Sequence, residues 1–548
     1  MVHLRFPLVT LLVAGCSDDL ASPVAVSWSD SARTLSPGCV GSGYTTVQSA
    51  INAAVAGDLI EVCPGTYKER LTLSNKQLTL TSRDGAASVT LDGDWLGRTL
   101  SITTGSIVIV SNLTIQNGST TGTGGNVYCS ASSLELRDSV ILGGTALKGG
   151  GVGGSTCTGL AEANTISGNT ATLSGGGLYT SGGAFAVESN AITGNHSNGA
   201  GGGGYLNNST ASVHGNTVTW NTSGDDGAGL YVLNGAPSID ANTFEDNDTS
   251  DEAGGLRVKL AEATITGNTF ARNHADYRGG GVKVSHDEVA MSGNTYTDNT
   301  AYSYGGALFL YESASVIQGE TFDDNDADYG GAVAVQNGWG NVLLEDCTFF
   351  STHHSTNGGH LWISLPTRTT TVRRATMSGG EADNGGAIYA IGSNLTVENS
   401  ILADNDGLIS GGALALDGTT GKLRNSVLTR NEAPSGGALT LANGLVALKV
   451  SNTVFLDNLG GAALNVASGV APDVKYNDFS GNFADFAGMA DQIGYNGNLG
   501  AAPLFADPLN GDYGLLVGSA LIDGGDPALF DTNGSRSDIG RFGGPQGY

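Results

Sequence analysis

Apolar and polar positions repeat along this chain with a period of about 26 residues. The clearest marker is an asparagine that recurs in six consecutive steps of that length, at Asn169, Asn195, Asn221, Asn247, Asn273, Asn299 and Asn325. A second series stands five residues earlier, at Asn164, Asn190, Asn216, Asn242, Asn268 and Asn294, and an apolar residue lies between the two asparagines of each repeat. Each marker is followed by a polar turn, then Gly-Gly or a near relative, then a short alternating strand. Such repeats predict a solenoid, because none of them could bury its apolar face alone.

The length of the repeat favours one kind of solenoid. Strands of three to five residues that stack in register would pair by parallel hydrogen bonds about 4.8 Å apart. Asparagine at a turn tolerates left-handed backbone and can pass hydrogen bonds along the stack, and Gly-Gly allows a sharp corner. We therefore predict an all-β fold, a single-stranded right-handed parallel β-helix. A sandwich or propeller would have longer strands and a longer period.

The repeat motifs resemble those of known proteins. Phe-x-x-Asn at 244–247, 270–273, 322–325 and 455–458 alternates with Gly-Gly-apolar segments. This pattern is similar to the repeats of polymorphic outer-membrane proteins and, more broadly, to the pectin-lyase-like β-helix superfamily. The resemblance covers about residues 110–482. Residues 44–80 look like the usual start of such β-helices, which implies a short amphipathic helix at 47–56 that caps the N-terminal end.

The first residues read as a targeting segment. Arg5 precedes an apolar stretch at 6–14, which is typical of a secretory signal. The sequence ending at Cys16 resembles a bacterial lipobox, which implies a cleaved signal peptide at 1–16 and lipid attachment at Cys16. The alternative is an ordinary signal peptide that contains a chance cysteine. With the lipid as its only membrane contact, the chain would be an outer-membrane lipoprotein, at the cell surface or facing the periplasm.

The remaining chain divides by pattern into three parts. Residues 17–38 are aperiodic and read as a tether, 39–490 as the β-helix, and 491–548, where the period is lost, as a C-terminal capping segment. Export would permit disulfides. Cys39 could pair with Cys63, and Cys129 could face Cys157 on the next coil, which leaves Cys347 as a buried thiol.

Composition narrows the choice of partners. The chain has 548 residues, of which 86 are glycine, 14% are charged, and the net charge is −28. The apolar fraction of 39% is too high for a disordered acidic chain, and the glycine content too high for a long helical protein. The acidic surface argues against nucleic acid as a partner, because it repels phosphate.

One column of side chains is predicted to face outward, ten residues after the marker asparagine. Its members are Tyr179, Tyr205, Tyr231, Arg257, Lys283 and Phe309, and with small shifts in loop length Trp362 and Tyr389. Exposed aromatic rings at coil spacing could stack on sugar rings, and the cations could pair with uronate or sulfate groups. The column therefore predicts a groove for an acidic or neutral polysaccharide or surface glycan. The alternative is a plain ladder of side chains on a sheet.

Two acidic segments are candidate calcium sites, and Ca²⁺ is the cofactor they would accept. Around Asp323, Asp324, Asp326 and Asp328 like charges gather, and a solvated edge is the alternative. In the last segment Asp531, Asn533 and Asp538 alternate around a glycine, as in half of a calcium loop. Simple Asx turns would give the same pattern.

Catalysis stays open at this level. Of the polygalacturonase motifs only an Asp-Asp pair is present, at Asp225 and Asp226. If the chain is a polysaccharide lyase, Arg257 or Lys283 would be the base and Tyr231 the acid. We favour a non-catalytic surface lipoprotein, a rigid rod for adhesion or glycan binding. A tethered lyase or hydrolase on acidic polysaccharide and a structural surface-layer component are the alternatives.

Overall fold

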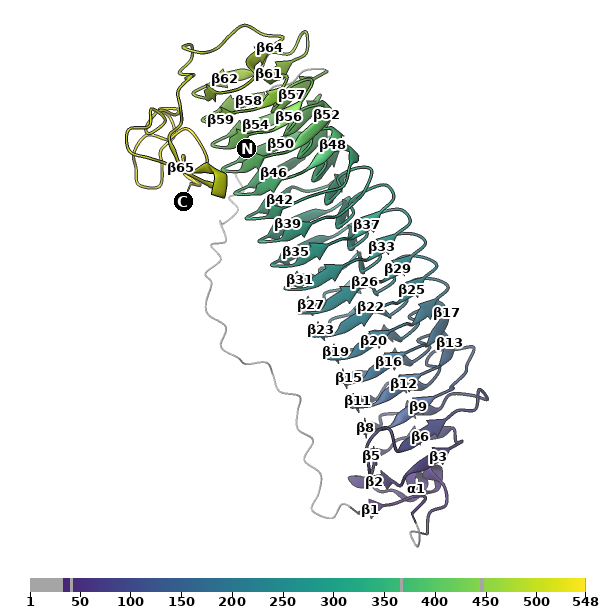
Figure 1. The fold of residues 1–548 in the computed structure, drawn as a ribbon. Coiled ribbons are helices and arrows are strands. Elements are labelled where there is room, and N and C mark those ends of the chain that lie inside the picture. Colours follow the sequence, from purple (N-terminus) through teal and green to yellow (C-terminus); the bar gives the residue numbers. More distant parts are fainter. Residues whose placement is uncertain (1–32, 40–42, 365–367, 444–447, 548) are drawn as a thin grey trace, which may run out of the picture.

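The computed structural model describes residues 33–39, 43–364, 368–443 and 448–547. The predicted signal peptide, Cys16 and residues 17–32 of the predicted tether lie outside the described residues. The described chain winds into one long stack of coils, from the purple N-terminal end to the green end in Figure 1. The stack contains three long sheets and two short ones, in which successive coils pair in parallel. The C-terminal segment adds a separate antiparallel pair, β65 (Phe505–Asp507) and β66 (Asp512–Leu515). The prediction of an all-β right-handed parallel β-helix is confirmed.

One coil shows how the chain forms the sheets. It runs through β26 (Leu230–Gly235), β27 (Ser238–Asp240), β28 (Thr243–Glu245) and β29 (Asp248–Thr249) before β30 (Leu256–Lys259) starts the next coil. We call the sheet that holds β27 sheet A, that of β28 sheet B, that of β26 and β30 sheet C, and the short one of β29 sheet D. A second short sheet, sheet E, occupies the place of sheet D in later coils, from β44 (Ser355–Asn357) to β60 (Leu459–Gly460).

The core is a stack of like residues at like positions. The apolar residue between the two asparagines points inward, and five of these rings form a continuous pile, Phe244, Phe270, Tyr296, Phe322 and Phe349. Their ring centroids lie 4.6 to 5.1 Å apart from one coil to the next, and the rings are close to parallel. Offset stacking of this kind adds to the free energy gained by burying each ring.

Two ladders of buried asparagine side chains run along the corners on either side of that pile. Asn247 is typical: its Nδ2 donates to Asn273 Oδ1 at 2.9 Å and to the Val218 carbonyl at 2.9 Å. Its backbone N–H also donates to Asn273 Oδ1, at 3.2 Å. The amide is fully buried, and its hydrogen-bonding groups are satisfied by the coils before and after it. Burial without partners would cost each amide about 1–3 kcal/mol.

The corner residue before each marker asparagine is left-handed. Asp246, Arg272, Asp298 and Asp324 have φ between 50° and 54°. Acidic residues are common there because Asp tolerates this conformation better than most. Arg272 interrupts the acidic run and donates to Asp246 Oδ1 at 2.9 Å, which relieves the repulsion between neighbouring coils.

The glycine pairs are required by close approach of the next coil. A Cβ on Gly254 would lie 2.5 Å from the His274 carbonyl oxygen, and one on Gly255 2.6 Å from the Gly281 carbonyl oxygen. Backbone contacts this short leave no room for any side chain. The regular recurrence of Gly-Gly is therefore a packing requirement of the corner that leads into sheet C.

The N-terminal end is closed by α1 (Val47–Ala53), within the predicted range of 47–56. Thr46 caps the helix by accepting from the Ser49 N–H, and the Glu69 carboxylate accepts from the N–H groups of Val47 and Gln48. The inner face of α1 covers the first coils with Val47, Ala50 and Ile51. Its polar face stays in solvent, so the open end of the apolar core is sealed.

The cysteines are paired in this N-terminal half. Cys39 is joined to Cys63, and Cys129 to Cys157, with Cα–Cα distances of 5.5 and 5.7 Å. Both bridges link neighbouring coils. Cys347 is a buried free thiol, and burial raises its pKa to about 12, so it stays protonated and unreactive.

The C-terminal segment lies along the flank of the stack. Asn498 still extends an asparagine ladder by accepting from Asn477, but from about residue 501 the chain turns back beside sheet B, as the yellow segment of Figure 1 shows. A second small core joins the two. From sheet B it contains Ile401, Ala403, Val427 and Val454, and from the segment Phe505, Tyr513, Leu521 and Ile539. Earlier coils carry threonine at the outward positions that these apolar residues occupy.

Glu320 replaces asparagine in one of the buried ladders, and this makes a prediction about pH. Its carboxyl oxygens accept from the backbone N–H and Nδ2 of Asn294, at 2.9 and 3.0 Å. Burial raises the pKa of Glu320 to about 8, so the folded state keeps a proton that the unfolded chain loses near pH 4.5. Stability should therefore fall as pH rises between these two values, by up to roughly 1.4 kcal/mol per pH unit.

We expect Glu320→Gln to remove this dependence. Its melting temperature should match that of the wild type near pH 5 and exceed it increasingly up to pH 8. Glu432→Gln, at an exposed position, is the control and should show no such divergence. A constant or shrinking difference between Glu320→Gln and the wild type would contradict the assignment.

Candidate functional site

Charged side chains converge on the outer face of sheet C in the middle of the stack. The loops that lead from sheet D to sheet C carry acidic residues in two successive coils, at 225–226 and 251–252. Carboxylate oxygens of Asp225, Asp226 and Asp251 lie within 4.8 Å of one another. Together with Glu252, Arg257 and Lys283 we call these residues the ion cluster. The cluster lines a cavity of about 370 Å³, whose walls also include Lys259, Arg278, Ser285, His286 and Tyr311.

The two cations of the cluster sit side by side on sheet C. Arg257 on β30 pairs in register with Lys283 on β34 (Val282–Ser285). Arg257 Nε donates to Asp226 Oδ2 at 3.0 Å, and Lys283 forms an ion pair with Glu252. In both pairs the acid precedes the base by 31 residues, so the same geometry recurs one coil further on. The side chains of Arg257 and Lys283 are only 3% and 5% exposed.

Burial gives the cluster unusual proton affinities. Burial lowers the pKa of Lys283 to about 8, although Asp226 and Asp251 oppose that shift. Burial also raises the pKa of Asp251, and the neighbouring Asp226 and Asp225 raise it further. A lysine whose pKa is near 8 is partly neutral in mildly alkaline solution and can then accept a proton.

The predicted exposed ribbon is wrong. Its side chains do point away from the core, but Tyr179, Tyr231, Arg257, Lys283, Phe309 and Trp362 are buried, and Tyr205 and Tyr389 are half-buried. The loops between sheets D and C fold over this face and cover it. Beneath them Tyr205 stacks on Tyr179 and on Tyr231, with centroids 5.6 and 4.7 Å apart. Burial raises the pKa of Tyr231 well above its usual range, which disfavours it as a proton donor.

A group of accessible tyrosines adjoins the ion cluster instead. Phe309 and Trp362 form a small apolar centre, against which Tyr304, Tyr311, Tyr329 and Tyr389 pack half-buried. Tyr304 stacks on Tyr329 with centroids 5.0 Å apart, and Tyr311 also lines the charged cavity. The sequence reasoning missed Tyr304 and Tyr329. Their signal was a tyrosine directly before Gly-Gly in two successive repeats.

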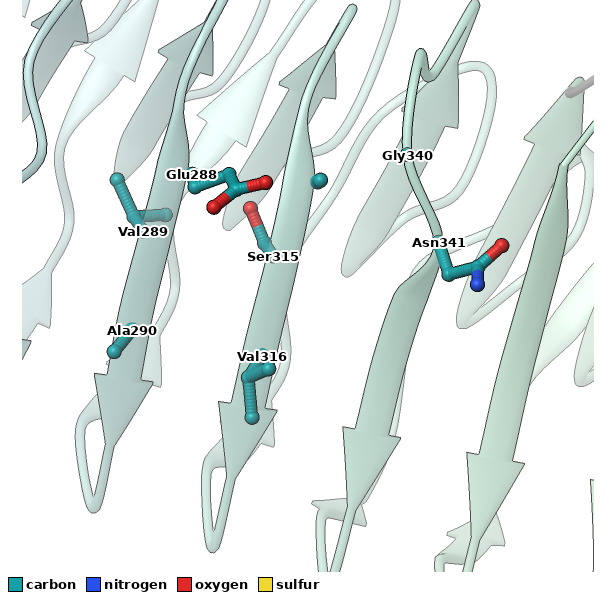
Figure 2. Close-up of a pocket in the computed structure, with 8 residues that line it drawn as sticks. Glu288, Val289, Ala290, Ser315, Val316, Gly340 and Asn341 are labelled. Atoms are coloured by element: carbon teal, nitrogen blue, oxygen red, sulfur yellow. The ribbon is translucent and has the colours of Figure 1, made fainter. Parts of the chain in front are cut away.

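The hollow surface continues around the corner onto sheet A. His286 lines both the charged cavity and a corner cavity of about 400 Å³, where Trp339 and the buried Asp287 also lie. Burial raises the pKa of Asp287 to about 6. Glu288 links this corner to a shallow hollow over β35 (Glu288–Ser292) and β39 (Ala314–Gln318). In Figure 2 its carboxylate lies beside Ser315, and Asn341 comes from the following coil.

The C-terminal calcium candidates take part in hydrogen bonds within their own segment. Asp531 Oδ1 accepts from the N–H groups of Asp538 and Gly544, and Asp538 Oδ1 accepts from the Asp523 N–H at 2.7 Å. Asn533 Oδ1 accepts from the Ser535 N–H, which is an Asx turn. The calcium site at these residues stays a prediction.

One family model matches the middle of the chain. The model of the right handed beta helix region matches residues 202–367, which contain the ion cluster. No curated protein matches this chain. Among solved structures, the catalytic unit of the α-1,3-glucanase of Streptomyces thermodiastaticus is 14% identical with a TM-score of 0.29, over 67% of this chain and 66% of that one.

Two other solved structures are similarly distant. A mutant of the alginate lyase AlyGC is 10% identical with a TM-score of 0.26, over 85% of this chain and all of that one. The pectate lyase Pel9A is 13% identical with a TM-score of 0.24, over 95% of this chain and 97% of that one. Likenesses this distant do not bear on what the chain binds. Within the described residues, no helix has the length and apolar character needed to cross a membrane.

The burial of the tyrosine stack can be tested by stability. Tyr231 is 6% exposed, whereas Tyr277, on the covering loop of a nearby coil, is 54% exposed. We expect Tyr231→Ala to lower the free energy of unfolding by about 2–4 kcal/mol and Tyr277→Ala to change it by less than about 0.5 kcal/mol. Urea unfolding followed by circular dichroism measures both. If both variants unfold at the same urea concentration, Tyr231 is not buried and the column is exposed as the sequence predicted.

Proposed function

We propose that this protein binds acidic polysaccharide on the outer face of sheet C, with the ion cluster as the centre of the site. The observation that carries the proposal is the convergence of three carboxylates with cationic side chains in one cavity of about 370 Å³. Asp225, Asp226 and Asp251 would hold Ca²⁺, which takes oxygen ligands and would bridge to the carboxylate of a uronate. The half-buried Lys259 and Arg278 at the rim would pair with further sugar carboxylates.

Electrostatics supports a bridging cation. The net charge of −28 repels a polyanion, and the ion pairs already neutralise much of the positive charge of Arg257 and Lys283. Mutual repulsion contributes to the raised pKa of Asp251, so a divalent ion there would gain favourable energy. Tyr304, Tyr311 and Tyr329 would then offer ring faces to the neighbouring sugar residues.

The setting we propose is the cell surface. Export by the segment 1–16 and a lipid on Cys16 would tether the rod to the outer membrane, and the stiffness of the stack would hold the site away from it. This part rests on the N-terminal sequence alone.

Calcium dependence is the first test. We expect polygalacturonate or alginate to bind in millimolar Ca²⁺ and to lose most of its affinity in EDTA, measured by calorimetry. The double variant Asp225→Asn/Asp251→Asn should bind at least about tenfold more weakly. Asp248→Asn, on exposed sheet D of the same coil, is the control and should bind as the wild type. Calcium-independent binding, or equal affinity for a neutral glucan, would contradict the proposal.

A second candidate function is cleavage of the same polymer by β-elimination, favoured by the pKa of Lys283 near 8. The neutral amine would take the proton from C5 of the uronate, the C4–O bond would break, and the leaving oxygen would take a proton from Tyr311. The product would carry a C4–C5 double bond. Because Lys283 is ion-paired with Glu252 and nearly covered, that pair must open first, which ranks elimination below binding.

Elimination has its own readout in the ultraviolet absorbance of unsaturated uronates. We expect the rate to rise with pH and to level off above about 8, since only the deprotonated amine accepts a proton. Lys283→Met should abolish the signal, while Lys422→Met, at an exposed position on sheet A several coils away, should retain it. If the protein binds uronate polymers and no ultraviolet absorbance develops, elimination is excluded and only the binding function remains.

A further inference from the structure

A second polar hollow lies on the corner between sheets B and D, apart from the ion cluster. Its volume is about 440 Å³, and its lining residues are Asp298, Thr300, Asp324, Asp326, His353 and His354. They come from three successive coils. From the sequence, the acidic residues around Asp324 were a candidate calcium site, with a solvated edge as the alternative. The two histidines were not included, because they stand a full repeat further along the chain.

The loop that carries the histidines contains an extra residue. Asn325 bridges to Thr352, and Tyr329 bridges to Asn357. The partners of the second bridge stand one position further apart in the sequence than those of the first. The additional residue therefore lies between these bridges, and it produces a local bulge. The bulge falls where the fourth side of the coil lacks a continuous sheet: sheet D ends at β37 (Thr300–Ala301), and sheet E begins at β44.

Like charges crowd in the hollow, and imidazoles lie beside them. Burial and the adjacent Asp324 raise the pKa of Asp298. Burial also raises the pKa of Asp326, although the nearby His353 opposes that shift. His353 Nε2 lies 3.3 Å from Asp324 Oδ1, and its side chain is 65% exposed. His354 is 46% exposed and contacts Asp383 Oδ1 at 3.1 Å. Both imidazoles line the same hollow as Asp324 and Asp326.

We propose that this hollow binds a divalent transition-metal ion of the zinc class through His353, His354, Asp324 and Asp326. Imidazole nitrogen and carboxylate oxygen together suit Zn²⁺ and its neighbours, whereas Ca²⁺ takes oxygen alone. The ion would remove the repulsion among the carboxylates. It would also fasten successive coils together at the point where the fourth side lacks a continuous sheet. The site is independent of polysaccharide binding.

The experiment uses the full chain without a polyhistidine tag, after removal of metal by a chelator. We expect one equivalent of Zn²⁺ to bind by calorimetry and the melting temperature to rise by a few degrees, increasing with the logarithm of free Zn²⁺. Affinity should fall in acidic buffer, because protons compete with the metal ion for its ligands. Ca²⁺ should not reproduce the shift.

Variants distinguish Zn²⁺ binding in this hollow from nonspecific binding to exposed histidines elsewhere on the surface. His353→Ala/His354→Ala and, separately, Asp324→Asn should each weaken Zn²⁺ binding at least about tenfold. His196→Ala is the control, because His196 is an exposed histidine on sheet D bonded to Thr222 and Asn198, and it should bind as the wild type. Asp225→Asn/Asp251→Asn should also leave Zn²⁺ binding unchanged. Full affinity in the double histidine variant or in Asp324→Asn would overturn the proposal.

Discussion

Every feature of this molecule depends on the register in which one coil stacks on the next. The buried asparagines enforce it, because the side-chain amide of Asn247 finds its partners in Val218 and Asn221 on the coil before and in Asn273 on the coil after. A slip of one residue would leave a whole row of amides unsatisfied and would turn the aromatic pile toward solvent. The ladders are therefore less a source of net stability than a penalty on every other alignment.

Because the register is fixed, residues one repeat apart form columns along the stack. The ion cluster forms where the residue types change in two of these columns, the outer face of sheet C and the loops that lead to it. Tyrosines occupy the outer column up to Tyr231, and Arg257 and Lys283 follow. In the loop column the acids Asp226 and Glu252 stand one coil earlier than the bases they pair with. Because both columns repeat with the period of the coil, six residues on an otherwise regular scaffold form two matched ion pairs and a group of carboxylates.

The periodic part of this structure could be predicted from sequence, and the aperiodic part could not. Asn247 and its relatives revealed the period, and the helix near Val47 showed its amphipathic pattern. Periodicity also indicated correctly that Tyr231 points away from the core. It could not show that the loops between sheets D and C fold over the ring of Tyr231 and bury it. Likewise, the extra residue in the loop of His353 appears in the sequence only as a shift in the 26-residue period. That His353 lies beside Asp324 follows from the stacking of the coils and is visible only in the structure.

The segment folded back beside sheet B changes how the rod can come apart. Stacked coils at an open end would peel away singly, since each holds only its neighbours. Here Asn399, Asn425 and Asn452, on three different coils, all bond the returning segment, at Arg541, Ser537 and Asp526. These three coils can therefore separate only after the returning segment has detached from them. The C-terminal end then unfolds as one cooperative block and not by fraying.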